Sequence, residues 1–467
     1  MKQFLLLFVL IFTSANIHSQ ENLPTDYLSK EFHKGRREAF RNLMPANSVA
    51  VVFSYPERVF SKDINYTYHA NPDMYYLTGY KEPDAVLLLF KEPQGDEKYT
   101  EVLFVRERNA AQETWTGRRL GVEGAKSKLG FTTVYNGKDF NAFTIDFKKF
   151  DKIIYDKIPT DLGKNKSGFD LFGLIESFKS KAAIKTDDEA PVILFDNITN
   201  SLREIKTPEE LDLMRKTIKL SCIAHNEVMK AVGPDMSENE ADGIHRYIHR
   251  HYGAEDEGYA LIVGAGANGC ILHYGENNAT KMDNQLLLMD VGSEYHGYSA
   301  DVTRTVPANG KFSEEQKAIY QLVYEAQEEV FKICKVGTPF QDLNKKAKEV
   351  ITAGLIKLGI ITDPKDVRIY YPHSCSHFLG LDVHDKGNYM STLKENMIFT
   401  VEPGIYIPAN SKCDKKWWNI GVRIEDDILI TKNSYENLSA ASPRKWQDVE
   451  ALANQKSTFN EMKFPKI

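Results

Sequence analysis

Short apolar runs alternate with amphipathic stretches along the first part of the chain, up to about residue 197. Runs rich in Val, Leu and Phe, which predict buried strands, occupy residues 48–55, 85–90, 101–105 and 192–195. Amphipathic stretches between such strands are typical of helices that cover a sheet. We therefore predict an α/β domain here, with a flexible glycine-containing loop at residues 163–168.

Two helix starts follow this region. Thr207 and Glu210 have the spacing of a capping box, with a proline between them in the first helical turn. Ser237 and Glu240 repeat the capping box after a Gly-Pro pair that ends the first helix. These signals predict two successive helices, at about residues 207–232 and 237–252.

Strand patterns dominate two later regions, at residues 259–306 and 398–430. Between them, helical spacing of apolar residues predicts helices at about 313–335 and 339–358. In the first region, two runs flank a short turn through His296 and Gly297. The pattern predicts a hairpin between residues 286–292 and 298–305.

A glycine-rich segment at residues 264–269 follows an apolar strand and has the spacing of a dinucleotide-binding fingerprint. That function requires a helix to begin at the third glycine. Residues 270–284 contain Gly275 and three asparagines, and their apolar positions lack helical spacing. We therefore favour a glycine-rich turn that lets the backbone approach a ligand or a neighbouring strand.

The N-terminus carries a charged residue, Lys2, then an apolar run at residues 4–12 and several small residues. This pattern predicts a signal peptide over residues 1–20 and export to the periplasm or the medium. The run is too short to span a bilayer, so we expect no stable membrane anchor. A net charge of −6 without long basic runs argues against nucleic acid as a partner.

Four carboxylates interrupt otherwise apolar strand patterns. Asp290 and Asp301 lie on the two arms of the predicted hairpin, and Glu402 ends a run just before a Pro-Gly turn. Glu425 shares a strand face with Arg423. Burial of a carboxylate is costly unless a cation or hydrogen bonds compensate. Each acid alone fits a surface, turn or ion-pair role, but four together predict a buried acidic site.

Three histidines cluster in the sequence between Asp301 and Glu402. His373, His377 and His384 fall within twelve residues, whereas the whole chain has 12 histidines. Clustered imidazoles indicate metal ligation or acid–base chemistry, although each one alone is more typical of a structural histidine. An oxygen-rich site with one imidazole suits a pair of divalent cations, and Mn²⁺ fits better than a metal that needs thiolate ligands.

These residues carry a family resemblance. Pita-bread metallopeptidases have five metal ligands, and the set here resembles them in order: Asp290, Asp301, His377, Glu402 and Glu425. The chain most resembles aminopeptidase P, on residues 373–385 and, in the N-terminal part, on residues 71–80 and 115–121. The resemblance implies an α/β N-terminal creatinase-like domain over residues 21–198 and an α+β pita-bread catalytic domain over residues 199–467.

By this resemblance the chain is an Xaa-Pro aminopeptidase, which releases the N-terminal residue of peptides with proline in second position. Asp290 would hold one metal ion, His377 and Glu402 the other, and Asp301 and Glu425 both. Two divalent ions, most simply Mn²⁺, acidify a shared water and polarise the scissile carbonyl. Glu402 would act as general base and then as acid.

The resemblance also implies the substrate contacts. His273 and His384 would act in catalysis by contacting the substrate near the scissile bond. His373, Tyr406 and Arg423 would form the walls of a prolyl pocket. Such a pocket is chemically reasonable because proline in a peptide has no N–H, so a site that needs none can accept its ring.

Three alternative functions remain open from the sequence. A prolidase would be restricted to Xaa-Pro dipeptides, and a non-catalytic binding module or a creatinase-type hydrolase would not need the five ligands. The family also implies a homo-oligomer, a dimer or tetramer in which Trp115 and Arg118 reach a neighbouring site. For Trp115, packing inside its own domain is the alternative.

Overall fold

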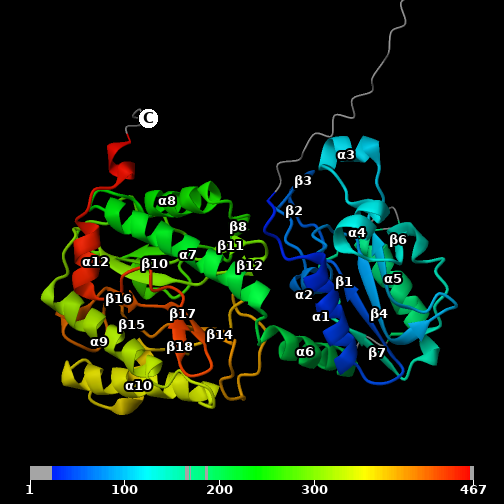
Figure 1. Cartoon of the computed structure of the whole chain (residues 1–467). Helices are drawn as coiled ribbons and strands as arrows, with labels where there is room; N and C mark the ends of the chain where they lie inside the picture. The colour runs from blue at the N-terminus through cyan, green and yellow to red at the C-terminus, as the bar shows by residue number, and fades with distance from the viewer. Residues whose placement is uncertain (1–23, 163–167, 169, 185–187, 463–467) are drawn as a thin grey trace, which may run out of the picture.

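A computed structural model describes residues 24–162, 168, 170–184 and 188–462, which form two lobes (Figure 1). The predicted signal peptide and all but one residue of the predicted loop at 163–168 lie outside these residues. Among the residues that the structure describes, no helix combines the length and the apolar character needed to cross a bilayer.

The N-terminal lobe is built on a five-stranded sheet in the order β6-β5-β4-β1-β7. The central strands β1 (Ser48–Phe53), β4 (Val86–Gln94) and β5 (Tyr99–Val105) pair antiparallel and contain three of the predicted runs, which are confirmed. The edge strand β6 (Val134–Asn136) pairs in parallel with β5, and the edge strand β7 (Lys152–Tyr155) pairs in parallel with β1.

Alternate residues of β1 enter two different cores, as expected for a strand buried on both faces. Val51 and Phe53 belong to the same core as α5 (Leu171–Ala182), whereas Val52 faces the core that contains α1 (Lys30–Leu43). The second core continues into the C-terminal lobe, where it includes Tyr298. Apolar packing therefore joins the two lobes.

The predicted strand at residues 192–195 is wrong, because these residues lie in α6 (Ala190–Arg203). Phe195 and Ile198 are buried on one side of this helix, while Ile193 is 54% exposed. A four-residue apolar run fits a strand or a helix equally well, and only the spacing of the buried positions distinguishes them. The division of domains at 198/199 falls within α6 and stays a prediction.

The N-terminal lobe has further short elements. The helix α2 (Pro72–Thr78) begins at Asn71, whose side chain accepts hydrogen bonds from the first-turn amides, and ends at Gly79 in the left-handed region. The remaining elements are α3 (Ala110–Thr116), α4 (Gly121–Leu129) and the hairpin of β2 (Val59–Ser61) and β3 (Ile64–Asn65).

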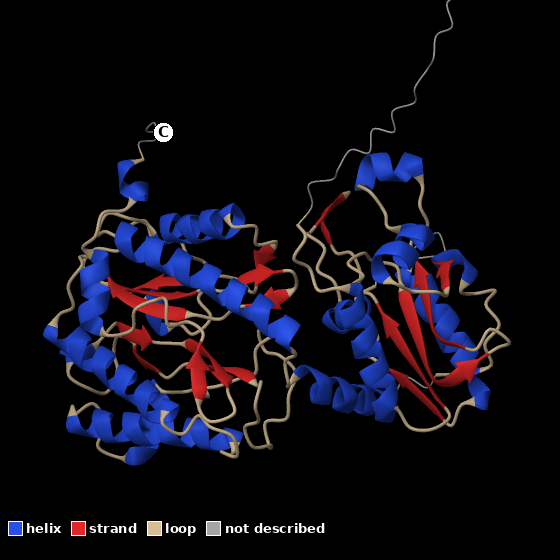
Figure 2. Ribbon diagram, viewed as in Figure 1, coloured by secondary structure: helices blue, strands red, loops and turns tan. Residues whose placement is uncertain are grey.

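Two pairs of long helices enclose the strands of the C-terminal lobe (Figures 1 and 2). The first pair is α7 (Pro208–Ala231) with α8 (Glu238–His251), and both predicted capping boxes are present. The second pair is α9 (Glu314–Phe331) with α10 (Phe340–Lys357), close to the predicted bounds. Shorter helices are α11 (Val367–Tyr370) and α12 (Trp446–Ala453).

The strands between the helix pairs form small antiparallel sheets. The predicted hairpin is confirmed, since β10 (Leu286–Asp290) pairs with β13 (Thr303–Pro307). The remaining strands are β8 (Asp256–Glu257), β9 (Ile262–Ala265), β11 (Ser293–Tyr295), β12 (Tyr298–Ser299), β14 (Ile398–Val401), β15 (Gly404–Ile407), β16 (Ile420–Arg423), β17 (Asp426–Ile430) and β18 (Tyr435–Asn437).

The glycine-rich segment forms a tight turn rather than the start of a crossover helix. A 3₁₀ turn, Asn268–Cys270, follows β9, and residues 271–285 contain no helix. A Cβ atom at Gly421 of β16 would lie 2.2 Å from the carbonyl oxygen of Gly269. The segment therefore serves close backbone packing, and the dinucleotide fingerprint is a coincidence of spacing.

Candidate active site

The C-terminal lobe contains a cavity of about 640 Å³. Nine of the ten residues singled out from the sequence line it: Asp290, Asp301, His377, Glu402, Glu425, His273, His373, His384 and Arg423. Tyr406 is buried beside the cavity and contacts two of these residues. Long-range folding thus brings together side chains from five separate segments of the chain.

The two aspartates meet because their strands pair. Asp290 ends β10, and Asp301 follows the short hairpin of β11 and β12 that connects β10 to β13. The hydroxyl of Tyr259 lies 2.5 Å from Asp290 Oδ1 and 2.6 Å from Asp301 Oδ1. A hydroxyl has one proton and can donate to only one carboxylate at a time, so a cation would relieve the crowding of these oxygens.

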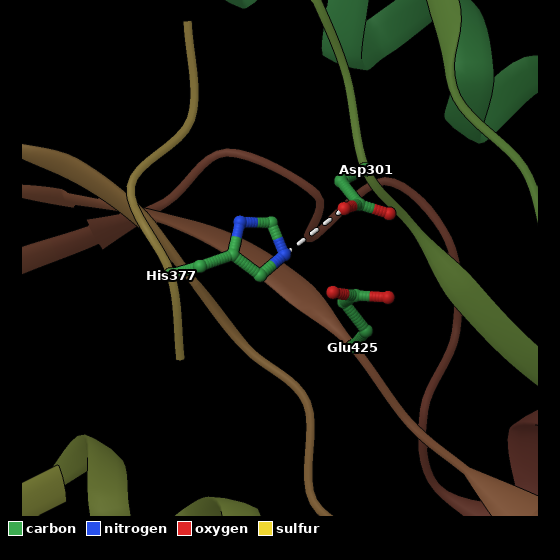
Figure 3. Close-up of side chains that lie close together, drawn as sticks. All are labelled: Asp301, His377 and Glu425. Atoms are coloured by element: carbon green, nitrogen blue, oxygen red, sulfur yellow. Dashed lines mark ion pairs between the residues drawn. The ribbon is translucent and has the colours of Figure 1, made fainter. Parts of the chain in front are cut away.

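Asp301, His377 and Glu425 form the tightest cluster, in which one ligand atom from each lies within 4.8 Å of the others (Figure 3). His377 Nε2 is 3.2 Å from Asp301 Oδ2 and 3.6 Å from Glu402 Oε1. The other ring nitrogen, Nδ1, is 3.0 Å from the carbonyl oxygen of Phe378. A backbone contact of this kind orients a histidine so that its free nitrogen can bind a metal.

The carboxylates are crowded and removed from water. Burial raises the pKa of Asp290 to about 6, that of Glu402 to about 8 and that of Glu425 well above its usual value. Burial opposes the charge of His377, but the hydrogen bond to Asp301 and the charge of Glu402 outweigh it and raise the pKa of His377 to about 9. The cavity therefore favours positive charge.

This donor set fits divalent cations. Four carboxylates and one imidazole supply the hard oxygen and borderline nitrogen ligands that such ions prefer. Arg423 is the buried cation that faces them, and its Nη2 donates to Asp290 Oδ2 at 2.6 Å. The raised pKa values of Glu402, Glu425 and His377 show that these groups hold protons in the metal-free site, and a divalent cation would displace those protons.

A hydrogen-bonded chain runs along one side of the cavity. Arg423 Nη1 donates to the Tyr406 hydroxyl at 2.7 Å, and that hydroxyl lies 2.9 Å from His373 Nε2. His373 Nδ1 lies 2.7 Å from the carbonyl oxygen of Ser374. Burial lowers the pKa of His373 to about 4, so this imidazole is neutral at pH 7. Tyr406 thus supports the wall formed by the other two side chains.

The remaining histidines come from separate segments. His384 is exposed to the cavity, and its ring packs edge-on against that of His377, with 4.3 Å between centroids. His273 lines the cavity from the segment that follows the glycine-rich turn. Both can therefore contact a molecule bound beside the carboxylates.

Sequence reasoning missed two polar residues of the site. Tyr259 contacts both aspartates, and the Thr303 hydroxyl donates to Glu425 Oε2 at 2.6 Å. It also missed apolar lining residues, including Ile262, Leu272 and Tyr389. No spacing signal marks these residues, because they reach the cavity through tertiary packing: Ile262 through the pairing of β9 with β10, and Tyr389 through its contacts with Phe340 and Phe378.

Comparison with known proteins places this geometry in a class. The sequence pattern of "Metallopeptidase family M24" matches residues 212–432, and that of "Aminopeptidase P, N-terminal domain" matches residues 33–155. The Xaa-Pro aminopeptidase of Escherichia coli (strain K12) is 35% identical over 441 residues, which cover 91% of this chain and 98% of that protein.

Solved structures agree. Aminopeptidase P from E. coli with the inhibitor Pro-Leu has a TM-score of 0.80 at 34% identity, over 91% of this chain and 98% of that one. The Zn-substituted E. coli enzyme in complex with product has a TM-score of 0.81 at 33% identity, over 92% and 100% of the two chains. The fold and the site therefore define a metal-dependent hydrolase with a pita-bread catalytic domain. The chain belongs to metallopeptidase family M24, in its aminopeptidase P group.

Proposed function

We propose that this protein removes the N-terminal residue from peptides whose second residue is proline. The observation that carries the proposal is the convergence of all five expected metal ligands on one cavity, beside His373 and Arg423. The same activity is named for the E. coli relative. A non-catalytic binding module would have no reason to keep four carboxylates in a largely buried site.

The ligand residues have distinct roles in this proposal. Asp290 would hold one ion, His377 and Glu402 would hold the other, and Asp301 and Glu425 would contribute to both. When bound, the ions supply Lewis acidity that activates water and polarises the scissile carbonyl. An oxygen-rich site with one imidazole makes Mn²⁺ the proposed metal.

Glu402 transfers the proton of the attacking water in this proposal. Its carboxyl lines the cavity beside His377, with Oε1 3.6 Å from Nε2, so it can reach a water or a substrate bound there and act as general base and then as acid. It first accepts the proton of the attacking water and then donates it to the leaving proline nitrogen. His384 and His273 contact the substrate around the scissile bond. His373 and Arg423, braced by Tyr406, bound the space for the prolyl ring.

Assembly and location belong to the proposal as well. Trp115 is 88% exposed on α3, which argues against packing inside its own domain and supports a role in contact with a second subunit. We propose a homodimer or homotetramer. The N-terminal pattern of Lys2 and an apolar run supports export.

The test is cleavage of an Xaa-Pro-Yaa tripeptide and of an Xaa-Pro dipeptide by purified protein, with Mn²⁺ or after chelation. We expect Mn²⁺-dependent release of the first residue from the tripeptide. Cleavage of the dipeptide alone would favour a prolidase, and negligible turnover of the tripeptide by folded protein in both conditions would reject the proposal.

Glu402→Gln tests the proton transfer. This variant should lower kcat by about 10²–10⁴-fold, because the amide cannot accept the proton. Elemental analysis of bound Mn²⁺ separates this effect from loss of a metal ligand. Glu395→Gln, at an exposed position near β14, is the matched control and should retain activity. Equal activity of the two variants would contradict the role of Glu402.

A further inference from the structure

A turn at residues 378–386 carries His384 to the cavity. The backbone of this turn is closed by hydrogen bonds from Asp385 N to Phe378 O at 2.9 Å and from Gly380 N to Asp382 O at 3.1 Å. While His384 lines the cavity, Asp382 and Asp385 contact the junction between α6 and α7. The residues around His384 are therefore held from outside the cavity.

Arg203, the last residue of α6, lies at the centre of these contacts. Its Nη2 donates to Asp382 Oδ2 at 2.7 Å and also pairs with Asp385. Lys206 donates to Asp385 Oδ2 at 2.9 Å and to the carbonyl oxygen of Arg203 at 2.7 Å. The side chains of Arg203, Lys206 and Asp385 are each only 1% exposed.

The N-terminal lobe supplies the other half of the network. Asp73 of α2 accepts from Arg203 Nη1 at 2.9 Å, and its second oxygen lies 2.9 Å from Lys386 Nζ. Asn71, which caps α2, donates to the carbonyl oxygen of Phe53 at the end of β1. Asp73 is thus anchored to the central sheet, and Figure 1 shows α6 bridging the two lobes.

The network sets Arg203, Lys206 and Lys386 opposite Asp73, Asp382 and Asp385, and Lys386 also pairs with Asp196 of α6. Buried ion pairs are weak stabilisers, because desolvation offsets their attraction, but removal of one partner is destabilising because it leaves a buried charge less well compensated. A Cβ atom at Gly380 would lie 2.1 Å from Asp385 Oδ2, so the turn packs directly on the network. The arrangement fixes geometry rather than adding stability.

We propose that Arg203 is a positioning residue that couples Asp73 of the N-terminal lobe to the turn carrying His384, so that the N-terminal lobe sets the geometry of the catalytic cavity. This inference rests on the proposed contact between His384 and the substrate. It assigns the N-terminal lobe a part in the reaction although Asp73 and Arg203 are not among the residues that line the cavity.

The test uses the full-length protein loaded with Mn²⁺ and the variants Asp73→Asn and Arg203→Lys. Both should lower kcat/KM by about 10–100-fold, because small misplacements of a substrate contact are costly. The metal content should stay equal to that of the wild type. Arg215→Lys is the matched control, since Arg215 makes a half-exposed ion pair with Glu436, and it should change kcat/KM less than twofold.

Combination with histidine variants separates positioning from general stability. In a His384→Ala background, Asp73→Asn should lower kcat/KM by less than about twofold, because the side chain that Asp73 helps to position is absent. In a His273→Ala background, Asp73→Asn should still lower kcat/KM by about 10–100-fold, because His273 lies on a different segment of the chain. Equal losses in both backgrounds would overturn the proposal.

A second readout is independent of turnover. Hydrogen–deuterium exchange of residues 378–386 in the Mn²⁺-loaded protein should be at least about tenfold faster in Asp73→Asn than in Arg215→Lys. Unchanged exchange in Asp73→Asn would overturn the proposal even when the double variants are too slow to assay. Absence of wild-type activity on Xaa-Pro peptides would instead count against the proposed function.

Discussion

Tyr259 lies between the carboxylates of Asp290 and Asp301 and contacts both. Burial and these two charges raise the pKa of its phenol well above the usual value, so the hydroxyl stays protonated. A neutral hydroxyl in this position can donate to either of the two acids, one at a time, without adding charge. Mutation of a residue that orients metal ligands in this way typically lowers metal affinity by about 10–100-fold.

Tyr259→Phe removes only this hydroxyl. The affinity for Mn²⁺ should fall by about 10–100-fold, because the two carboxylates lose a shared orienting contact. Competition with a chromophoric chelator measures the change. Tyr247→Phe is the matched control, since Tyr247 is 53% exposed on α8, and its affinity should equal that of the wild type. An unchanged affinity in Tyr259→Phe would show that the hydroxyl has no orienting role.

Strands and turns determine whether the ligands can meet. Gly292 lies between β10 and β11, and a Cβ atom there would be 1.7 Å from the carbonyl oxygen of Ala300. This close backbone crossing lies next to both Asp290 and Asp301. The absence of a side chain at Gly292 therefore lets the two segments that carry the proposed ligands Asp290 and Asp301 approach each other.

Gly292→Ala should disrupt this crossing. We expect a loss of roughly 1–3 kcal/mol in the free energy of unfolding, because the backbone must shift, and a lower content of bound Mn²⁺. Gly243→Ala on α8 is the control: its Cβ would meet no atom within 4 Å, so a gain of about 0.5–1 kcal/mol is expected. Denaturant unfolding and elemental analysis measure both effects, and full metal content in Gly292→Ala would contradict the argument.

The whole molecule buries histidines in both lobes, outside the catalytic cavity. Burial lowers the pKa of His33 to about 4, that of His225 to about 3 and that of His245 well below its usual value. The folded protein keeps these side chains neutral, whereas the unfolded chain binds protons below about pH 6.5. Each such histidine therefore lowers stability as the pH falls from about 6.5 toward 4.

His225→Gln isolates this effect. Between pH 6.5 and 4 the wild type should lose about 1.4 kcal/mol per pH unit relative to the variant, because one proton fewer binds on unfolding of the variant. Urea unfolding in the presence of chelator measures it. The site carboxylates, whose raised pKa values act in the opposite direction, are common to both proteins and cancel.

His251→Gln, at an exposed position, provides the control, because it shows what replacement of a histidine by glutamine does to the free energy of unfolding without burial. If the free energy of unfolding changed with pH in the same way in His225→Gln and in the wild type, His225 would not change its protonation on unfolding.

The sequence by itself determined what local chemistry can record. The capping boxes at Thr207 and Ser237 specify helix starts within a single turn, so α7 and α8 were predictable. The five proposed ligand residues, Asp290, Asp301, His377, Glu402 and Glu425, each stand in a recognisable local context, and their order indicates the family. These signals depend on neighbours in the chain and need no knowledge of packing.

Only the tertiary structure decided which distant segments meet. The apolar run at 192–195 became part of α6 because the surrounding core buries one helical face. Tyr259 reached the aspartates through strand pairing, and Arg203 joined Asp73 to the turn of His384 through contact between the lobes. These outcomes depend on sheet register and on packing across many residues, which local patterns of polar and apolar positions do not encode.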